Sequence, residues 1–329
     1  MGSASSDVLV ADYVGGVRIL ILGGTSFVGR AIVTAAQRDG HDVTIFNRGR
    51  TGPELFPEVA RLSGDRDSGD YESLAGSSWD AVVDVSAYVP RHVREATGVL
   101  GDRVGRYLLI STGSVYGGPG ERLAPEHGTE EITASTYGPL KVACEDVALE
   151  VYGERATVVR PGVVAGPHDP TDRFTYWVRR AARGGRVLLA GSPDAPFQVV
   201  DSGDLATLVV TLLADDRPGA FDAVGPAEPV TMAEMIRICA RAAGQEAEVV
   251  TVPLADAGPG LPLVLDDPDD YWLFRLSSAA ARAAGMPSTP LSETAAAVLA
   301  WDRDRGEPEM SGGPDPEREA KLLEIAGQS

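Results

Sequence analysis

An apolar run that leads straight into a glycine-rich turn constrains the fold more than any other part of this chain. Val17–Leu22 predicts a buried strand, residues 23–29 form the turn, and a helix is predicted from Val28 to Arg38. Glycine lets the backbone of such a turn approach a pyrophosphate, whose charge the amides at the helix start stabilise. The alternative is a tight strand-to-helix turn that binds nothing. The predicted cofactor contacts are Gly23, Gly24, Ser26, Phe27, Val28 and Gly29.

Strand-like and helical segments alternate through the first half of the chain. Further strands are predicted at residues 41–46, 81–85, 106–110 and 156–160. This alternation is typical of an α/β fold with a Rossmann-type doubly wound parallel sheet. The predicted organisation is a flexible tail over 1–16, a sheet domain over 17–165 to which 197–224 returns, and a smaller interleaved C-terminal α/β lobe over 166–196 and 225–329.

Charge and cysteine usage narrow the class of protein. The formal net charge of −19 opposes binding to nucleic acid or to anionic membrane surfaces. Cys144 and Cys239 lie far apart without metal spacing, and the four histidines are scattered. We therefore expect no metal site, no nucleic acid or membrane partner, and a reduced cytoplasmic setting.

Lys141 is one of only two lysines in the chain and stands four positions after Tyr137. Other positive charge is carried by arginine, so this position favours an amine that a guanidinium cannot replace. Residues four apart share one helix face, so the ammonium is expected beside the phenol, where it favours the phenolate. A tyrosine made acidic in this way acts as a general acid or base near neutral pH. The alternative is a surface helix with an incidental Tyr and Lys.

The end of the second predicted strand bears on cofactor choice. Asn47 stands where an acidic residue would bind both ribose hydroxyls of NAD, and Arg48 and Arg50 follow it. A neutral amide beside arginines suits a 2′-phosphate, so NADP(H) is favoured over NAD(H). The alternative is that both arginines are solvated loop charges.

Four motifs follow one another in the first 170 residues. They are the glycine turn, residues 111–117 (Ser-Thr-Gly-Ser-Val-Tyr-Gly), the Tyr137/Lys141 pair and residues 160–167 (Arg-Pro-Gly-Val-Val-Ala-Gly-Pro). Together they resemble the extended short-chain dehydrogenase/reductase superfamily, specifically its NAD-dependent epimerase/dehydratase family. The resemblance implies a Rossmann domain, an interleaved C-terminal substrate lobe and a homodimer.

The resemblance also implies roles for single residues. It places Thr112 at the catalytic Ser/Thr position, Tyr137 as acid/base, and Lys141 on the nicotinamide ribose and beside the phenol. Asp65, followed by Arg66, matches the aspartate that contacts adenine. The segment that passes under the cofactor and the residues that flank the nicotinamide are Val85, Ser86, Ala87, Pro161 and Val163.

The chain departs from the family pattern at two places. Ser26 replaces the second glycine of the phosphate turn, as in atypical members, and its Cβ limits backbone approach. Members that dehydrate or decarboxylate nucleotide sugars place an acid shortly after the catalytic threonine, where this chain has Gly113 and Ser114. We therefore expect carbonyl reduction, alcohol oxidation or epimerisation through a keto intermediate.

The predicted substrate contacts are Ser114, Arg173 and Tyr176. Arg173 would bind an anion and Tyr176 would offer aromatic surface, in the segment where the family forms its substrate cleft. The alternatives are that Tyr176 and Trp177 pack a helix against the sheet, and that Ser114 bonds its own loop.

These features together predict an NAD(P)-dependent oxidoreductase acting on a small molecule, with a natural-product intermediate or a nucleotide sugar as substrate. A nucleotide-sugar epimerase is the first alternative. A non-catalytic NADP-binding regulator and an RNA-binding member are the others. The set of Thr112, Tyr137 and Lys141 argues against the regulator, and the net charge of −19 argues against RNA.

Overall fold

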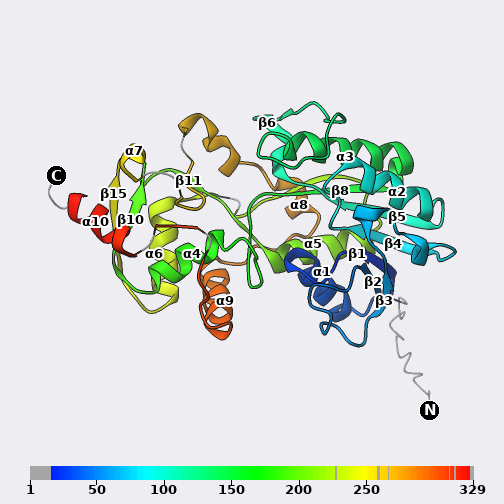
Figure 1. The fold of residues 1–329 in the computed structure, drawn as a ribbon, viewed down its shortest axis with the longest axis horizontal. Helices are drawn as coiled ribbons and strands as arrows, with labels where there is room; N and C mark the ends of the chain where they lie inside the picture. The colour runs from blue at the N-terminus through cyan, green and yellow to red at the C-terminus, as the bar shows by residue number, and fades with distance from the viewer. Residues whose placement is uncertain are drawn as a thin grey trace, which may run out of the picture.

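The computed structural model describes residues 16–226, 228–257, 260–265, 267–310, 312–314 and 316–326. Figure 1 shows two lobes side by side, one built on a large sheet and one smaller and mostly helical. The predicted flexible tail, apart from Gly16, lies outside the described residues.

A seven-stranded parallel sheet forms the first lobe and confirms the predicted doubly wound α/β fold. Its central strands are mostly apolar and buried, as expected where both faces of a sheet are covered, and the edge strands β3 and β13 are more exposed. In spatial order they are β13 (Gly219–Ala223), β8 (Ala156–Pro161), β5 (Val104–Ile110), β4 (Trp79–Asp84), β1 (Arg18–Leu22), β2 (Asp42–Asn47) and β3 (Ala60–Ser63).

Helices cover both faces of this sheet. Helices α1 (Phe27–Arg38) and α5 (Ser202–Ala214) pack on one face, and α2 (Pro90–Leu100) and α3 (Tyr137–Tyr152) pack on the other. Side chains alternate along a strand, so Ile19 and Ile21 of β1 join the first core and Leu20 and Leu22 join the second. The sheet therefore separates two hydrophobic cores.

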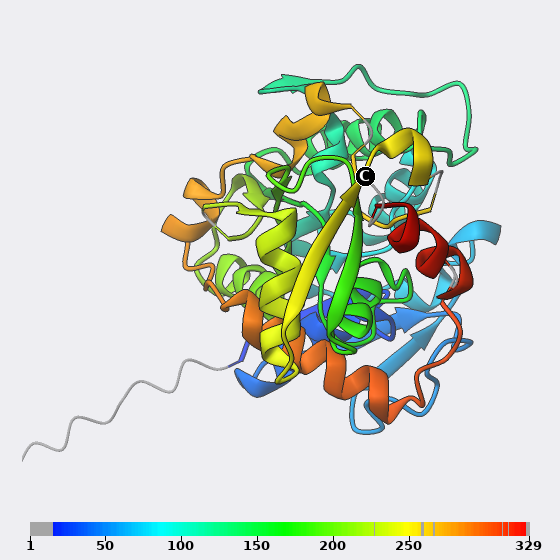
Figure 2. The ribbon, with the colours of Figure 1, turned by 90° about the vertical axis from the view of Figure 1, so that its left-hand side faces the viewer.

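In the C-terminal lobe, three helices pack against one another and beside a short sheet. Phe174, Trp177, Met235 and Val298 are among the buried residues of its core. Strands β10 and β15 are parallel and lie side by side in Figure 2. Its elements are α4 (Arg173–Ala181), β10 (Gly185–Ala190), β11 (Pro196–Phe197), β14 (Val230–Thr231), α6 (Met232–Ala242), β15 (Ala247–Val252), α7 (Leu254–Ala257), η5 (Pro268–Phe274), α9 (Leu291–Asp304) and α10 (Pro316–Ala326).

The chain crosses between the lobes more often than the sequence predicted. Strand β13 and helix α5, from the segment 197–224 that was expected to return, lie with the sheet, and α8 (Ala279–Ala283) does too, although residues 225–329 were assigned to the substrate lobe. Apolar side chains hold α8 there, because Ala281, Ala284 and Met286 are buried in the core beneath α5. Smaller elements are η1 (Arg66–Ser68), η2 (Glu72–Leu74), η3 (Gly113–Val115), β6 (Tyr116–Gly118), β7 (Glu121–Arg122), η4 (Gly153–Arg155), β9 (Val164–Ala165) and β12 (Val200–Asp201).

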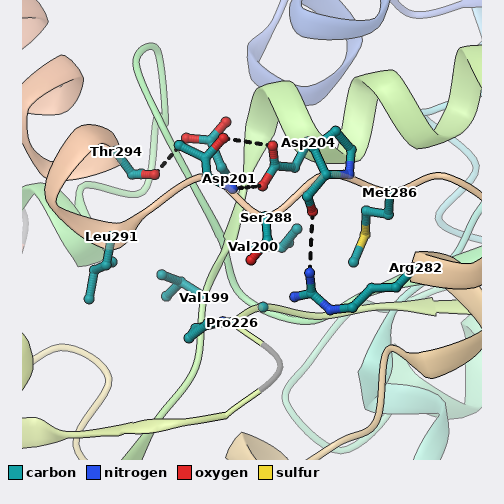
Figure 3. Close-up of a pocket in the computed structure, with 13 residues that line it drawn as sticks. Val199, Val200, Asp201, Asp204, Pro226, Arg282, Met286, Ser288, Leu291 and Thr294 are labelled. Carbon is teal, nitrogen blue, oxygen red and sulfur yellow. Dashed lines mark hydrogen bonds between the residues drawn. The ribbon is translucent and has the colours of Figure 1, made fainter.

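Two aspartates at the start of α5 join the lobes (Figure 3). Asp204 accepts hydrogen bonds from the backbone N and the Oγ1 of Thr289, each at 2.7 Å, and Asp201 accepts one from Thr294 Oγ1 at 2.7 Å. The cavity beside them measures about 10 Å³, room for about one water molecule. This place is therefore a joint between the lobes rather than a ligand site.

Candidate functional site

A groove runs along the carboxyl ends of the sheet strands, between the two lobes. It comprises a larger cavity of about 680 Å³ and a smaller cavity of about 260 Å³. In open α/β sheets this edge is where ligands bind. The residues that line both cavities are Gly23, Gly24, Ser26, Ser86 and Tyr88.

The glycine turn lies at the junction of the two cavities. Gly23 and Gly24 have φ values of +116° and +108°, which residues with a Cβ rarely adopt. Ser26 is the N-cap of α1, and its hydroxyl makes no capping bond, so the first amides of the helix remain available. These features suit a pyrophosphate.

Gly29 acts in a different way from the other predicted turn residues. It does not line the groove, and a Cβ placed there would lie 2.6 Å from the backbone N of Gly24. Its role is therefore to let α1 approach the turn closely. The predicted residues Phe27 and Val28 do line the groove.

Thr112, Tyr137 and Lys141 line the same cavity, although they come from separate segments of the chain. Thr112 is the N-cap of η3, and its Oγ1 accepts a hydrogen bond from the backbone N of Ser114 at 3.2 Å. Tyr137 and Lys141 are the first and fifth residues of α3 and lie one turn apart. The alternative of a surface helix is wrong, because Lys141 is only 3 % exposed.

Lys141 is held by the backbone rather than by a side chain. Its Nζ donates to the carbonyl oxygens of Ala87 at 2.6 Å and Ile110 at 2.8 Å, just beyond β4 and at the end of β5. An ammonium has three tetrahedral N–H donors, so one remains for a ligand. A planar guanidinium does not fit between two carbonyls in this way, which explains the lysine. The predicted residue Ala87 contributes this carbonyl and does not line the groove.

Tyr137 is less acidic than the sequence predicted. Burial raises the pKa of its phenol, and a hydrogen bond with Thr112 and the charge of Arg173 lower it by less. Burial also lowers the pKa of Lys141. In this structure the pKa of Tyr137 is therefore raised by burial, whereas the sequence predicted that the ammonium would lower it.

A buried carboxylate behind these residues was missed by the sequence analysis. Glu145 is fully buried on α3 and accepts from Ser111 Oγ at 2.5 Å and from Arg160 Nε and Nη2 at 2.9 and 2.8 Å. Ser111 precedes Thr112, and Arg160 precedes Pro161. Glu145 thus ties α3 to both neighbouring segments of the site. Its spacing of four residues from Lys141 was the available signal.

In the smaller cavity the predicted arginines lie beside carboxylates that pair with them. Asn47 donates to Thr25 Oγ1 at 3.2 Å, and its Oδ1 accepts from the backbone N of Gly49 at 2.9 Å. Arg48 pairs with Asp67 at 2.9 Å. The predicted residues that line this cavity are Asn47, Arg48, Arg50, Asp65 and Arg66.

Arg66 lines that cavity, but its guanidinium is already hydrogen-bonded to other side chains of the protein. Its guanidinium grips Asp84 with two hydrogen bonds of 2.6 and 2.7 Å and donates to Ser86 Oγ at 2.8 Å. Asp84 is fully buried and also accepts from Tyr107 at 2.6 Å. Arg66 holds the pKa of Asp84 below its usual value despite burial. Its role in this structure is to position Ser86 beneath the groove.

Most of the remaining predicted site residues lie where they were expected. Val85, Pro161, Val163, Ser114 and Arg173 line the larger cavity. Tyr176 does not, and the prediction that it contacts substrate is wrong for this structure. Its ring is 8 % exposed and meets Trp177 edge-on in the core of the C-terminal lobe, the alternative noted for that helix.

Within the described part of the chain, no group of three or more His, Cys, Asp or Glu side chains is placed to hold a metal ion. Cys144 and Cys239 are both buried and unpaired. Among the described helices, none has the length and apolar character needed to cross a bilayer.

The chain is similar in sequence to two proteins whose names describe different functions, stem-loop binding and reduction. The chain is 25 % identical to the chloroplast stem-loop binding protein of 41 kDa b of Arabidopsis thaliana, over 71 % of this chain and 65 % of that protein. It is 26 % identical to the 2′-dehydrokanamycin reductase of Streptomyces kanamyceticus, over 72 % of this chain and 69 % of that protein. The chain thus matches about two thirds of the length of each relative.

Solved structures share the fold at low sequence identity. The UDP-glucuronic acid 4-epimerase of Bacillus cereus, in complex with NAD, has a TM-score of 0.65 at 16 % identity, covering 87 % of this chain and 99 % of its own. RMD of Pseudomonas aeruginosa, complexed with NADPH, has a TM-score of 0.59 at 20 % identity, covering 88 % and 99 %.

A family model matches the part of the chain that carries Thr112, Tyr137 and Lys141 but not the glycine turn. The matched residues are 81–223, and the model is that of the NAD dependent epimerase/dehydratase family. They include Thr112, Tyr137, Lys141 and Glu145. Residues 81–223 are therefore similar to the NAD dependent epimerase/dehydratase family, and the fold of the chain is similar to that of the solved epimerase structure.

Proposed function

We propose that the protein is an NADP(H)-dependent oxidoreductase that transfers hydride to or from a carbonyl or carbinol carbon of a small molecule. The observation that carries the proposal is that Thr112, Tyr137 and Lys141 line one cavity with the glycine turn. The relative that is a reductase supports it. In this proposal the cofactor domain is 17–165 with 197–224 and α8, and substrate binds against 166–196 and the rest of 225–329.

The site residues supply proton transfer and orientation. The nicotinamide, when bound, supplies or accepts the hydride. Tyr137 delivers its phenolic proton to the developing alkoxide, and Thr112 orients the same oxygen by a hydrogen bond. Lys141 offers its third N–H to the groove and stabilises the phenolate that Tyr137 leaves behind. Ser114 steers the substrate, and its backbone N already holds Thr112 Oγ1 in place.

The residues around the groove fit a dinucleotide. The uncapped start of α1 takes the pyrophosphate, and Asp65, Arg48 and Arg50 surround the adenosine end. We propose NADP(H) over NAD(H) because Asn47 carries no charge at the ribose. We also infer a cytoplasmic homodimer, the usual assembly of the resembled family.

Replacement of Tyr137 by Phe tests the proton-transfer role. We expect turnover with NADPH to fall by about 10² to 10⁴-fold, with cofactor affinity unchanged. Tyr88→Phe is the matched control, because this tyrosine lines the same groove but is 46 % exposed. Full turnover in Tyr137→Phe would contradict the proposal. Tightly retained NAD in the purified protein would favour the epimerase.

RNA binding is a second candidate, favoured by the similarity to the stem-loop binding protein over 71 % of this chain. The net charge of −19 opposes it, because an RNA backbone requires a basic surface. A gel shift with structured RNA at rising salt distinguishes the two. A salt-dependent complex that persists with NADPH absent would favour this candidate.

A further inference from the structure

One wall of the larger cavity is made of apolar side chains from the C-terminal segment. Leu263, Leu265, Leu273 and Leu276 are each half-buried, so each leaves part of its side chain facing the groove. Phe274 lies among them, with its ring stacked at 5.9 Å on Phe197 of the lobe core. Apolar surface left in a cavity is unfavourable in water, and a ligand that covers it gains free energy.

Leu276 brings this apolar wall to the reacting end of the cavity. A Cβ at Gly113 would lie 3.2 Å from Leu276 Cδ1, so the leucine packs directly beside the turn between Thr112 and Ser114. Gln198, which is 3 % exposed, donates its amide to the carbonyl oxygen of Leu276 at 3.2 Å. The buried glutamine thus fixes the leucine in place. An acidic side chain at position 113 would press into it.

The charges of the cavity do not suit a nucleotide sugar. The charged side chains among its lining residues are Lys141, Arg173 and Asp169. Lys141 already donates to two carbonyls, and Thr171 Oγ1 connects the other two, because it donates to Asp169 at 2.7 Å and accepts from Arg173 Nε at 3.1 Å. Within this cavity, the diphosphate of a nucleotide sugar would therefore find one cation whose charge is partly neutralised. A neighbouring cavity that shares Leu276 is lined by Arg122, Arg160 and Arg275, but Arg122 and Arg160 are paired with Glu145, and Asp222 and Asp269 line the same space.

We propose that the substrate is a carbonyl compound, or the matching alcohol, whose apolar ring or chain lies on the leucine wall while its oxygen faces Thr112 and Tyr137. A nucleotide sugar is not the substrate. The inference rests on the proposed oxidoreductase function and extends it to a substrate class. The apolar wall and the pairing of Arg122 and Arg160 with a buried carboxylate support the same substrate class.

Binding to the NADP⁺-loaded protein tests the substrate class without turnover. Isothermal titration would compare 2-butanone, 2-hexanone and 2-octanone with UDP and UDP-glucose. We expect the ketone Kd to fall by up to about four-fold for each buried methylene, and neither nucleotide to bind at millimolar concentration. A ketone Kd that does not change with chain length, undetectable ketone binding, or tighter binding of UDP-glucose than of 2-octanone would each overturn the proposal.

A pair of variants localises the effect. Leu276→Asp should abolish the dependence of ketone Kd on chain length and leave the NADP⁺ Kd unchanged. Leu149→Asp is the control, because this leucine is 44 % exposed on α3 and does not line the cavity. An unaltered chain-length dependence in Leu276→Asp would overturn the assignment of the wall. Loss of NADP⁺ binding by the wild-type protein would instead contradict the oxidoreductase function itself.

Discussion

The two walls of the groove are held in place in different ways. On the sheet wall, polar side chains are fixed by buried partners, as Lys141 is by two carbonyls and Ser111 by Glu145. On the C-terminal wall, leucines are held by packing, with one hydrogen bond from Gln198 to the backbone of Leu276. Directional bonds suit a wall that moves protons, and packing suits one that only selects shape and polarity.

The largest expected effect is on the lysine of the sheet wall. Lys141→Arg should lower kcat/KM by about 10² to 10⁴-fold, because a guanidinium cannot point two donors at the carbonyls of Ala87 and Ile110 and a third at the groove. Steady-state kinetics with NADPH measures the change. Lys321→Arg, the same replacement at the other lysine, which is exposed on α10, should have no effect. Equal activity of the two variants would show that the wall tolerates either cation.

The next effect concerns the stability of the sheet wall. Glu145→Gln leaves Arg160 without its buried counter-charge, which typically costs about 3–5 kcal/mol. We expect a lower midpoint of urea unfolding. Asp146→Asn, the adjacent carboxylate with an exposed side chain, should change stability by about 1 kcal/mol or less. Similar midpoints for both variants would contradict the view that Glu145 clamps the site.

The pH dependence of reduction probes the phenol of the sheet wall. Burial raises the pKa of Tyr137, so its protonated form persists through neutral pH and is lost only as pH rises past the raised pKa. The rate of reduction should thus stay level with respect to this group up to about pH 10, the ordinary tyrosine value. The measurement is kcat/KM from pH 6 upward, with circular dichroism as a control for unfolding. A fall near pH 7 that disappears in Tyr137→Phe would show an acidified phenol instead.

The smallest effect is at the adenosine end of the groove. Arg48 pairs with Asp67 at 2.9 Å, and both side chains are largely exposed. Asp67→Asn removes the shorter of the two ion pairs of Arg48 and leaves the one with Asp65 at 3.9 Å. A 2′-phosphate then competes with one carboxylate fewer, so NADPH should bind up to about five-fold tighter relative to NADH, since exposed pairs contribute about 1 kcal/mol or less. Fluorescence titration with both cofactors measures the ratio. Asp102→Asn, which breaks the exposed pair with Arg155, should leave it unchanged. A ratio that moves toward NADH would contradict the proposed role of Arg48.

Local pattern was enough to predict the parallel sheet and the position of the glycine turn. Alternation of apolar strands and helices follows from short-range periodicity, and the glycine turn lies directly between β1 and α1. The sequence did not predict whether Tyr176 faces the core or the cleft, because an aromatic side chain is common in both places. Glu145 and Gln198 were missed because their partners are distant in sequence.

The sequence by itself determined the fold class and the residue types at the reacting centre, because strand periodicity, glycine conformation and the spacing of Tyr137 and Lys141 are local properties. Only the tertiary structure decided the hydrogen-bond partners and the burial of those residues. The partners of Lys141 lie 54 and 31 residues away along the chain, and burial, which raises the pKa of Tyr137, exists only once the chain is packed. The apolar wall that faces them likewise comes from residues 263–276, which no local pattern connects to the turn at Gly113.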